Sequence, residues 1–133
     1  MKYLLDTNTC IQFLNNASSP VVRAMQSVLC QDVAICDIVK AELYFGAERS
    51  GRVEHNLEVL DGFFSVFSSL PFDGAAARIY GNIKKDLFGK GTPIGPNDLL
   101  IAAIALANDL ILVTHNVDEF LRVDQLRIED WET

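Results

Sequence analysis

The sequence alternates short apolar runs with longer stretches of helical periodicity, and this alternation most constrains its fold. Four runs have the length and composition of buried strands: residues 3–5, 33–36, 66–72 and 111–113. A further short edge strand is expected at residues 127–129. Strands that alternate with helices favour a parallel sheet, because right-handed crossovers return the chain to the same end of the sheet. We therefore predict an α/β fold with a mostly parallel central sheet of four or five short strands, flanked by helices on both faces.

Helical patterns fill the segments between these runs. Ser18-Ser19-Pro20 predicts a helix start, since serine caps helices and proline suits their first position. Asp37 and Asp73 are expected to cap the helices that follow the second and third strands. The expected helices begin near residue 11, span 20–29, begin at 38, and span 53–64, 74–88 and 99–108. The last of these is apolar nearly all round, which predicts a central, buried helix.

Composition limits the class of protein. A chain of 133 residues, half of them apolar and 22% charged, suits one globular domain over its whole length. The net charge of −7 argues against broad electrostatic attraction to nucleic acid or an anionic membrane. The longest apolar run, residues 99–107, is too short to cross a bilayer, and the start shows no signal-peptide pattern, so we expect a cytoplasmic protein. Cys10, Cys30 and Cys36 lack a C-x-x-C spacing and are expected to be reduced core residues.

Polar residues follow the apolar runs at the points where parallel strands would end. Asp6, Thr7 and Asn8 come directly after the first run, and Asn116 comes shortly after the last. In open α/β sheets ligands bind outside the carboxyl ends of the strands, so these side chains would share one edge. Asp6 also suits the cap of the following helix, and for an isolated carboxylate in such a place capping is the commoner role.

Two further carboxylates can reach the same edge. Glu42 shares a helical stripe with apolar residues, but it could equally lie at the margin of that stripe and pair with Lys40 or Arg49. Asp98 opens the apolar helix, where capping and the helix dipole also favour an acid. Each of these carboxylates therefore has a structural and a functional interpretation.

A convergence of Asp6, Glu42 and Asp98 would require a cation. Two like charges about 4 Å apart repel by about 4 kcal/mol at an effective dielectric constant of about 20. That is a large share of the stability of a domain. Oxygen ligands select a hard ion, and a partly open carboxylate site suits Mg²⁺ or Mn²⁺. Such ions activate water and stabilise in-line displacement at phosphorus, which indicates phosphodiester hydrolysis.

Four motifs in order give the chain a resemblance to a known family. They are residues 4–8 (LLDTN), 42–47 (ELYFGA), 94–98 (IGPND) and 113–116 (VTHN). With these motifs the chain resembles the PIN-domain ribonucleases, and specifically the VapC-type toxins of bacterial toxin–antitoxin pairs. The resemblance covers nearly the whole length and implies a PIN-like fold.

The resemblance also implies roles for individual residues. Asp6, Glu42 and Asp98 would form an acidic triad, with Asp6 and Asp98 nearest to Mg²⁺. Three polar residues would support them: Thr7, Asn8 and Thr114.

The motifs leave open which residue of this chain takes the fourth acidic position of the family. Many PIN domains have an acid where Asn116 stands, whereas members similar to this chain carry the Thr-x-Asn-x-x-Glu-Phe pattern found at residues 114–120. Asn116, Asp118 and Glu119 are therefore alternatives for this position, and Asn116 and Glu119 are included among the predicted catalytic residues. The number of metal ions stays open with this choice.

The resemblance is strongest to the VapC group that cuts initiator tRNA in its anticodon loop, so a tRNA is the expected substrate. It also implies a homodimer and a VapB-like antitoxin whose basic tail enters the acidic site. The net charge of −7 would attract such a basic tail. Lys84, Lys85 and Lys90 form the densest basic cluster and are RNA-binding candidates, although a single surface lysine is usually just solvated. His115 is either an RNA contact or a solvated loop residue.

Two other functions compete with a Mg²⁺-dependent endoribonuclease toxin. A haloacid-dehalogenase-like phosphatase also starts with an aspartate after its first strand, but it normally has a second acid two residues later, where Asn8 stands. A catalytically silent PIN fold that acts as a binding module is disfavoured, because all three principal acids are present.

Overall fold

The computed structural model describes all 133 residues and contains one sheet with the strand order β3-β2-β1-β4-β5. All neighbouring strands pair in parallel. The strands are β1 (Tyr3–Leu5), β2 (Val33–Cys36), β3 (Ser68–Leu70), β4 (Ile111–Val113) and β5 (Ile128–Glu129). The predicted α/β class is confirmed, and the last short strand lies at the sheet edge as expected.

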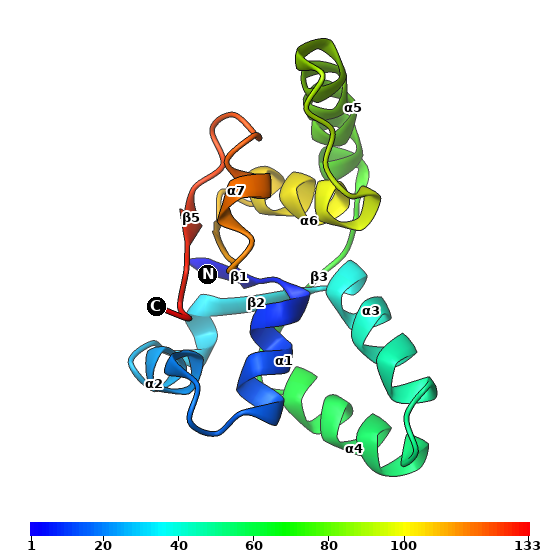
Figure 1. Cartoon of the computed structure of the whole chain (residues 1–133), viewed down its shortest axis with the longest axis vertical. Coiled ribbons are helices and arrows are strands. Elements are labelled where there is room, and N and C mark those ends of the chain that lie inside the picture. The colour runs from blue at the N-terminus through cyan, green and yellow to red at the C-terminus, as the bar shows by residue number, and fades with distance from the viewer.

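Helices cover both faces of this sheet. Figure 1 shows α1 to α4 on one side of the strands and α5 to α7 on the other. The helices are α1 (Thr7–Asn15), α2 (Pro20–Gln26), α3 (Asp37–Glu48), α4 (Val53–Phe64), α5 (Gly74–Lys90), α6 (Pro96–Ala107) and α7 (Val117–Phe120), with a 3₁₀ turn at Cys30–Asp32. None of the helices has the length and apolar character needed to span a lipid bilayer.

Several boundaries differ from the sequence predictions. Helix α2 ends at Gln26, because the Ser27 hydroxyl bonds back to a main-chain carbonyl and a 3₁₀ turn leads into β2. Strand β3 is shorter than expected, since the chain still turns at Phe67 and Pro71 cannot donate to a sheet ladder. Asp37 is the first residue of α3 and not its cap, a position where an acid still complements the helix dipole.

Other local predictions are confirmed. The Ser19 hydroxyl and the Asp73 carboxylate cap α2 and α5. Cys10 and Cys36 are buried and free, as expected, but Cys30 is exposed on the 3₁₀ turn, so its assignment to the core was wrong.

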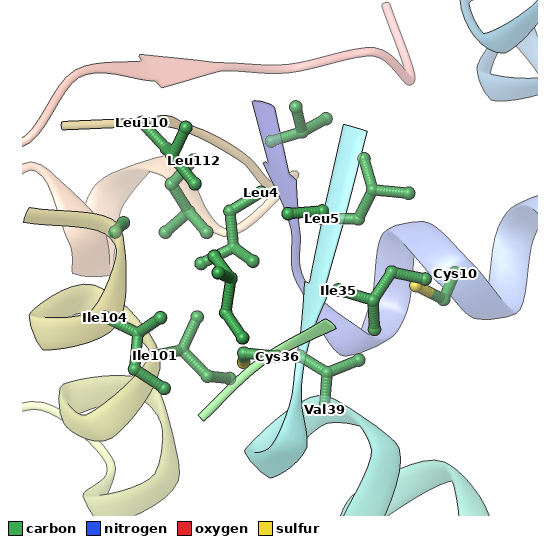
Figure 2. Close-up of a cluster of buried hydrophobic side chains, with 14 of the residues drawn as sticks. Leu4, Leu5, Cys10, Ile35, Cys36, Val39, Ile101, Ile104, Leu110 and Leu112 are labelled. Carbon is green, nitrogen blue, oxygen red and sulfur yellow. The ribbon is translucent and has the colours of Figure 1, made fainter. Parts of the chain in front are cut away.

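The core lies between the sheet and the two helix layers. Figure 2 shows that successive side chains of β1 point in opposite directions, Leu4 toward α6 and Leu5 toward α1. Ile101 and Ile104 of α6 are fully buried, which confirms that this helix is central. Burial of β1, β2 and β4 on both faces explains why these three strands appear in the sequence as continuous apolar runs.

The sheet changes its winding direction beside the first strand. From β1 the chain proceeds to β2 and β3 in one direction, and β4 and β5 are then added on the other side of β1. The winding direction therefore reverses between β1 and β4, and ligands in open α/β sheets bind outside the carboxyl ends of such a strand pair. Asp6 and Thr114 are the first residues beyond these two strand ends.

Candidate active site

Asp6 is a helix cap and a buried acid at the same time. Its carboxylate accepts a hydrogen bond from the Thr9 amide at 2.9 Å, which confirms the predicted capping of α1. Its main-chain amide donates to the Val113 carbonyl at 3.1 Å, so the end of β1 is tied to β4. The side chain is only 5% exposed. Burial raises the pKa of Asp6, hydrogen bonds from Thr114 and Thr9 oppose this rise, and the nearby charge of Glu42 adds to it.

Glu42 faces this carboxylate from α3. The Thr7 hydroxyl donates to Glu42 Oε1 at 2.7 Å, which joins α3 to the start of α1. The predicted pairing of Glu42 with Lys40 or Arg49 is wrong, because Glu42 forms no ion pair: Lys40 donates to Ser69 and Arg49 lies over the Phe45 ring. The glutamate is therefore held inward by a hydroxyl and keeps its charge close to Asp6.

Asp98 and Glu119 meet at the amino end of α6. Asp98 Oδ2 and Glu119 Oε1 lie 3.6 and 3.5 Å from the point where a side chain on Gly95 would begin. Burial, followed by the charges of Glu119, Glu42 and Asp6 and by hydrogen bonding with Glu119, raises the pKa of Asp98 to about 7. The four carboxyl groups thus form one electrostatically coupled set, which we call the acidic cluster: Asp6, Glu42, Asp98 and Glu119.

Glu119 is held in the cluster by the loop after β4. Its two carboxylate oxygens accept hydrogen bonds from the Gly95 amide, at 2.7 Å, and from the Asn116 side chain. The main-chain amide of Asn116 in turn donates to the Thr114 hydroxyl at 3.0 Å. Phe120, which is 1% exposed, anchors α7 in the core. Asn116 therefore orients the Glu119 carboxylate, while Asp118, the residue before Glu119, is exposed.

The other predicted site residues lie outside the acidic cluster. Asn8 is exposed and makes no side-chain hydrogen bond. Lys90 pairs with Asp86 and Asp124. Lys84 lies over two aromatic rings of α5, and Lys85 lines a separate hollow along the same helix. None of the three lysines forms an ion pair with the acidic cluster.

Two residues that hold members of the acidic cluster were not identified from the sequence. Thr9 is buried, its hydroxyl donates to the Val113 carbonyl at 3.1 Å, and its main-chain amide donates to the capping carboxylate of Asp6. Its position three residues after Asp6 is the usual capping distance and could have indicated this role. Gly95 contributes only a main-chain amide, for which a sequence carries no signal.

The acidic cluster suits a divalent metal ion. It offers only oxygen atoms, and no lysine, arginine or histidine neutralises any of its members. The pKa of Asp98 is raised first by burial and then by the resulting repulsion from the other members. A hard cation with oxygen ligands would relieve it, and Asp6 lies at the carboxyl ends of β1 and β4, where ligands bind in open α/β sheets.

Comparison with known proteins agrees with this arrangement. The family model of the PIN domain matches residues 3–126. The tRNA(fMet)-specific endonuclease VapC of Salmonella typhimurium is 41% identical over 131 residues, 98% of each chain. Ribonuclease VapC2 of Rickettsia felis is 37% identical over 133 residues, 99% of each chain. These matches remove the phosphatase alternative.

Solved structures show the same fold. DNA-bound VapBC from Salmonella typhimurium superposes with a TM-score of 0.93 at 41% identity, over 98% of both chains. VapBC2 from Rickettsia felis, bound to a DNA fragment from its promoter, gives a TM-score of 0.90 at 37% identity, over 98% of this chain and 99% of the other. PIN-domain nucleases are in general dependent on divalent metal ions, as the acidic cluster would require. This chain belongs to the PIN-domain family and, within it, to the VapC ribonucleases.

Proposed function

We propose that this protein is the toxin of a toxin–antitoxin pair, a Mg²⁺-dependent endoribonuclease that blocks translation by cutting RNA. The observation that carries this proposal is the coupled acidic cluster at the carboxyl ends of β1 and β4. Burial and neighbouring negative charge raise the pKa of Asp6 and Asp98, which costs stability, and such perturbed groups concentrate at functional sites. The cost is understandable where the carboxylates hold the cation that the reaction needs.

Each member of the cluster has a distinct part in this proposal. Asp6 and Asp98 would hold Mg²⁺, which supplies an activated water molecule and neutralises charge on the phosphate group. Glu42, fixed by the Thr7 hydroxyl, is placed to accept a proton or orient water. Glu119 fills the fourth acidic position and joins the loop before α6 to the loop after β4 through Gly95 and Asn116.

The proposed substrate is initiator tRNA, cut in its anticodon loop. The support is the 41% identity over nearly the whole chain to a protein named as a tRNA(fMet)-specific endonuclease. Lys84, Lys85 and Lys90 remain candidates for contacts with the tRNA backbone, and Lys90 is also paired with Asp86 and Asp124. The toxin would act in the cytoplasm, where tRNA is found.

The proposed partners are a second copy of the chain and a VapB-like antitoxin. Structural relatives were solved as VapBC complexes. An apolar groove of about 320 Å³ runs between α1, α3 and α4 and has Glu42 at its margin. An antitoxin segment with apolar side chains followed by a basic residue would fill the groove and extend its cation toward the acidic cluster. Occupation of the acidic cluster by that cation would exclude Mg²⁺ and RNA together.

The test is cleavage of an initiator tRNA transcript by the purified protein, with an elongator tRNA as the matched substrate control. We expect Mg²⁺-dependent cuts in the anticodon loop, mapped by sequencing the RNA ends, and no cuts in EDTA. Asp6→Ala or Asp98→Asn should lower the rate by about 1,000-fold or more while leaving the circular dichroism spectrum unchanged. Undiminished cleavage by Asp98→Asn would contradict the proposed site, and equal cleavage of both tRNAs would contradict the proposed substrate.

A further inference from the structure

A polar pocket of about 380 Å³ lies next to the acidic cluster and contains none of its four carboxylates. Six residues line it: Asn8, Ile11 and Gln12 from α1, His115 and Asn116 from the loop after β4, and Glu132 near the carboxyl terminus. Three of these side chains are neutral amides, which both donate and accept hydrogen bonds. No lysine or arginine lines the pocket, so His115 is its only source of positive charge.

The imidazole of His115 is held in one orientation by the end of the chain. Its Nδ1 lies 3.0 Å from Asp130 Oδ2 and 3.9 Å from Glu132 Oε2. Ionised carboxylates only accept hydrogen bonds, so Nδ1 carries a proton and donates it to Asp130. Nε2 makes no hydrogen bond within the protein, and the side chain is 59% exposed. A surface histidine is thus oriented by two acids and presents a free ring nitrogen.

The carboxyl-terminal turn that orients His115 is itself rigid. Thr114 donates to the Glu129 carbonyl at 2.9 Å across the β4–β5 pair, so His115 and Asp130 follow neighbouring strands at the same edge. Trp131 is buried and packs edge-on against Tyr3, with ring centroids 5.2 Å apart. The core therefore holds the turn, and through it the imidazole, in place.

We propose that this pocket binds one nucleotide of the RNA strand beside the bond that is cut, with His115 contacting its phosphate. The inference rests on the proposed ribonuclease function. The amides of Asn8, Gln12 and Asn116 suit the base edge or the ribose hydroxyls, which also donate and accept. Asn116 belongs to both the pocket and the acidic cluster through its bond to Glu119, so a nucleotide here is next to the reacting phosphate.

Electrostatics favours a phosphate as the partner of His115. The hydrogen bond to Asp130, with the charges of Glu132, Asp130 and Asp6, raises the pKa of His115, which increases the share of imidazolium. An imidazolium at the rim of an acidic cluster gives an approaching phosphate an attractive contact that the cluster alone lacks. His115 is thus a binding and positioning residue, separate from the groups that would hold the metal ion.

The pocket can be tested by comparing His115→Ala with His55→Ala, since His55 is the only other histidine and is exposed on α4. With an initiator tRNA transcript and saturating Mg²⁺, we expect His115→Ala to raise KM by roughly tenfold, the loss of one charge-assisted hydrogen bond, and to change kcat by less than about threefold. His55→Ala should match the wild type. His115→Arg, which keeps a cation able to pair with Asp130, should restore most of the affinity.

Several outcomes would overturn the proposal. Equal KM values for His115→Ala and His55→Ala, with the wild type cutting normally, would remove the pocket but leave the ribonuclease function intact. A loss confined to kcat would place His115 in the chemical step. His115, Asp130 and Glu132 also offer three ligand atoms within 4.8 Å of one another, so Mn²⁺ binding that disappears in His115→Ala would assign the histidine to a metal ion instead. Absence of any cleavage by the wild type would instead refute the proposed function.

Discussion

Replacement of Asp98 by asparagine should make the metal-free protein more stable while it destroys the activity. Asparagine has nearly the same shape as aspartate but no charge, so the repulsion from Glu119, Glu42 and Asp6 disappears. That repulsion, together with burial, raises the pKa of the Asp98 carboxyl from 3.8 to about 7. The folded state therefore retains a proton that the unfolded chain has already released.

The size and sign of the stability change follow from the difference in the pKa of Asp98 between the folded and unfolded states. Each pKa unit corresponds to about 1.4 kcal/mol, so the full shift corresponds to about 4 kcal/mol, and screening by water at this partly exposed carboxyl reduces it to about 2 kcal/mol. Between pH 3.8 and about 7 the folded state binds more protons than the unfolded state, so the free energy of unfolding falls as pH rises. The Asp98→Asn variant lacks this decrease.

Urea denaturation in EDTA at pH 5 and pH 8 measures the difference in stability between Asp98→Asn and the wild type and the dependence of this difference on pH. At pH 8 we expect Asp98→Asn to be more stable than the wild type by about 2 kcal/mol, or about 7 °C in Tm. At pH 5 the advantage should be less than half as large. Glu58→Gln, which removes one charge from the exposed face of α4, is the matched control and should change stability by less than about 0.5 kcal/mol. Equal stability of Asp98→Asn and wild type at pH 8, or an advantage independent of pH, would refute the electrostatic argument.

Three further predictions concern the same region. Mg²⁺ at about 100 times its Kd should raise the free energy of unfolding of the wild type by about 2.7 kcal/mol, and that of Asp98→Asn far less; equal gains would place the ion elsewhere. Glu119→Gln should lower the pKa of Asp98 by about one unit, because the largest opposing charge is removed; carboxyl NMR titration of the metal-free protein measures it, and an unchanged pKa would contradict the contact. Phe120→Ala should cost about 3–5 kcal/mol in urea denaturation, whereas Leu121→Ala, next in the chain and 65% exposed, should be nearly neutral; similar losses would mean that α7 is not anchored by Phe120.

The fold could be predicted because its central strands β2, β1 and β4 are buried on both faces. A run such as Ile111–Val113 then appears as an unbroken apolar stretch, and the regular alternation with helices implies parallel pairing. Boundaries were less predictable, because they depend on single hydrogen bonds. The start of α6 illustrates this: the helix begins at Pro96, three residues before the apolar run, since proline at its first position needs no partner for a main-chain amide.

The acidic site was predictable only in part. Asp6 and Asp98 were found from where elements end and begin, which is local information in the chain. The inward position of Glu42 depends on a hydroxyl 35 residues away, and its surface pairing was an equally good prediction until Thr7 was seen to hold it. The bond from Gly95 to Glu119 uses a main-chain amide, and the contact of His115 with Asp130 depends on β4 lying beside β5. Such contacts between separate elements leave no periodic pattern.

The acidic cluster links stability, metal binding and inhibition through a single quantity, its unneutralised negative charge. Any cation that enters it lowers the repulsion among Asp6, Glu42, Asp98 and Glu119, and therefore binds the folded state more tightly than the unfolded chain. Mg²⁺ and a basic residue of the proposed antitoxin would compete for this same charge. Because either one relieves the repulsion, the antitoxin would stabilise the fold at the same time as it displaces the ion needed for cleavage. The Asp98→Asn variant separates these effects, since it should bind both cations more weakly while its fold becomes more stable.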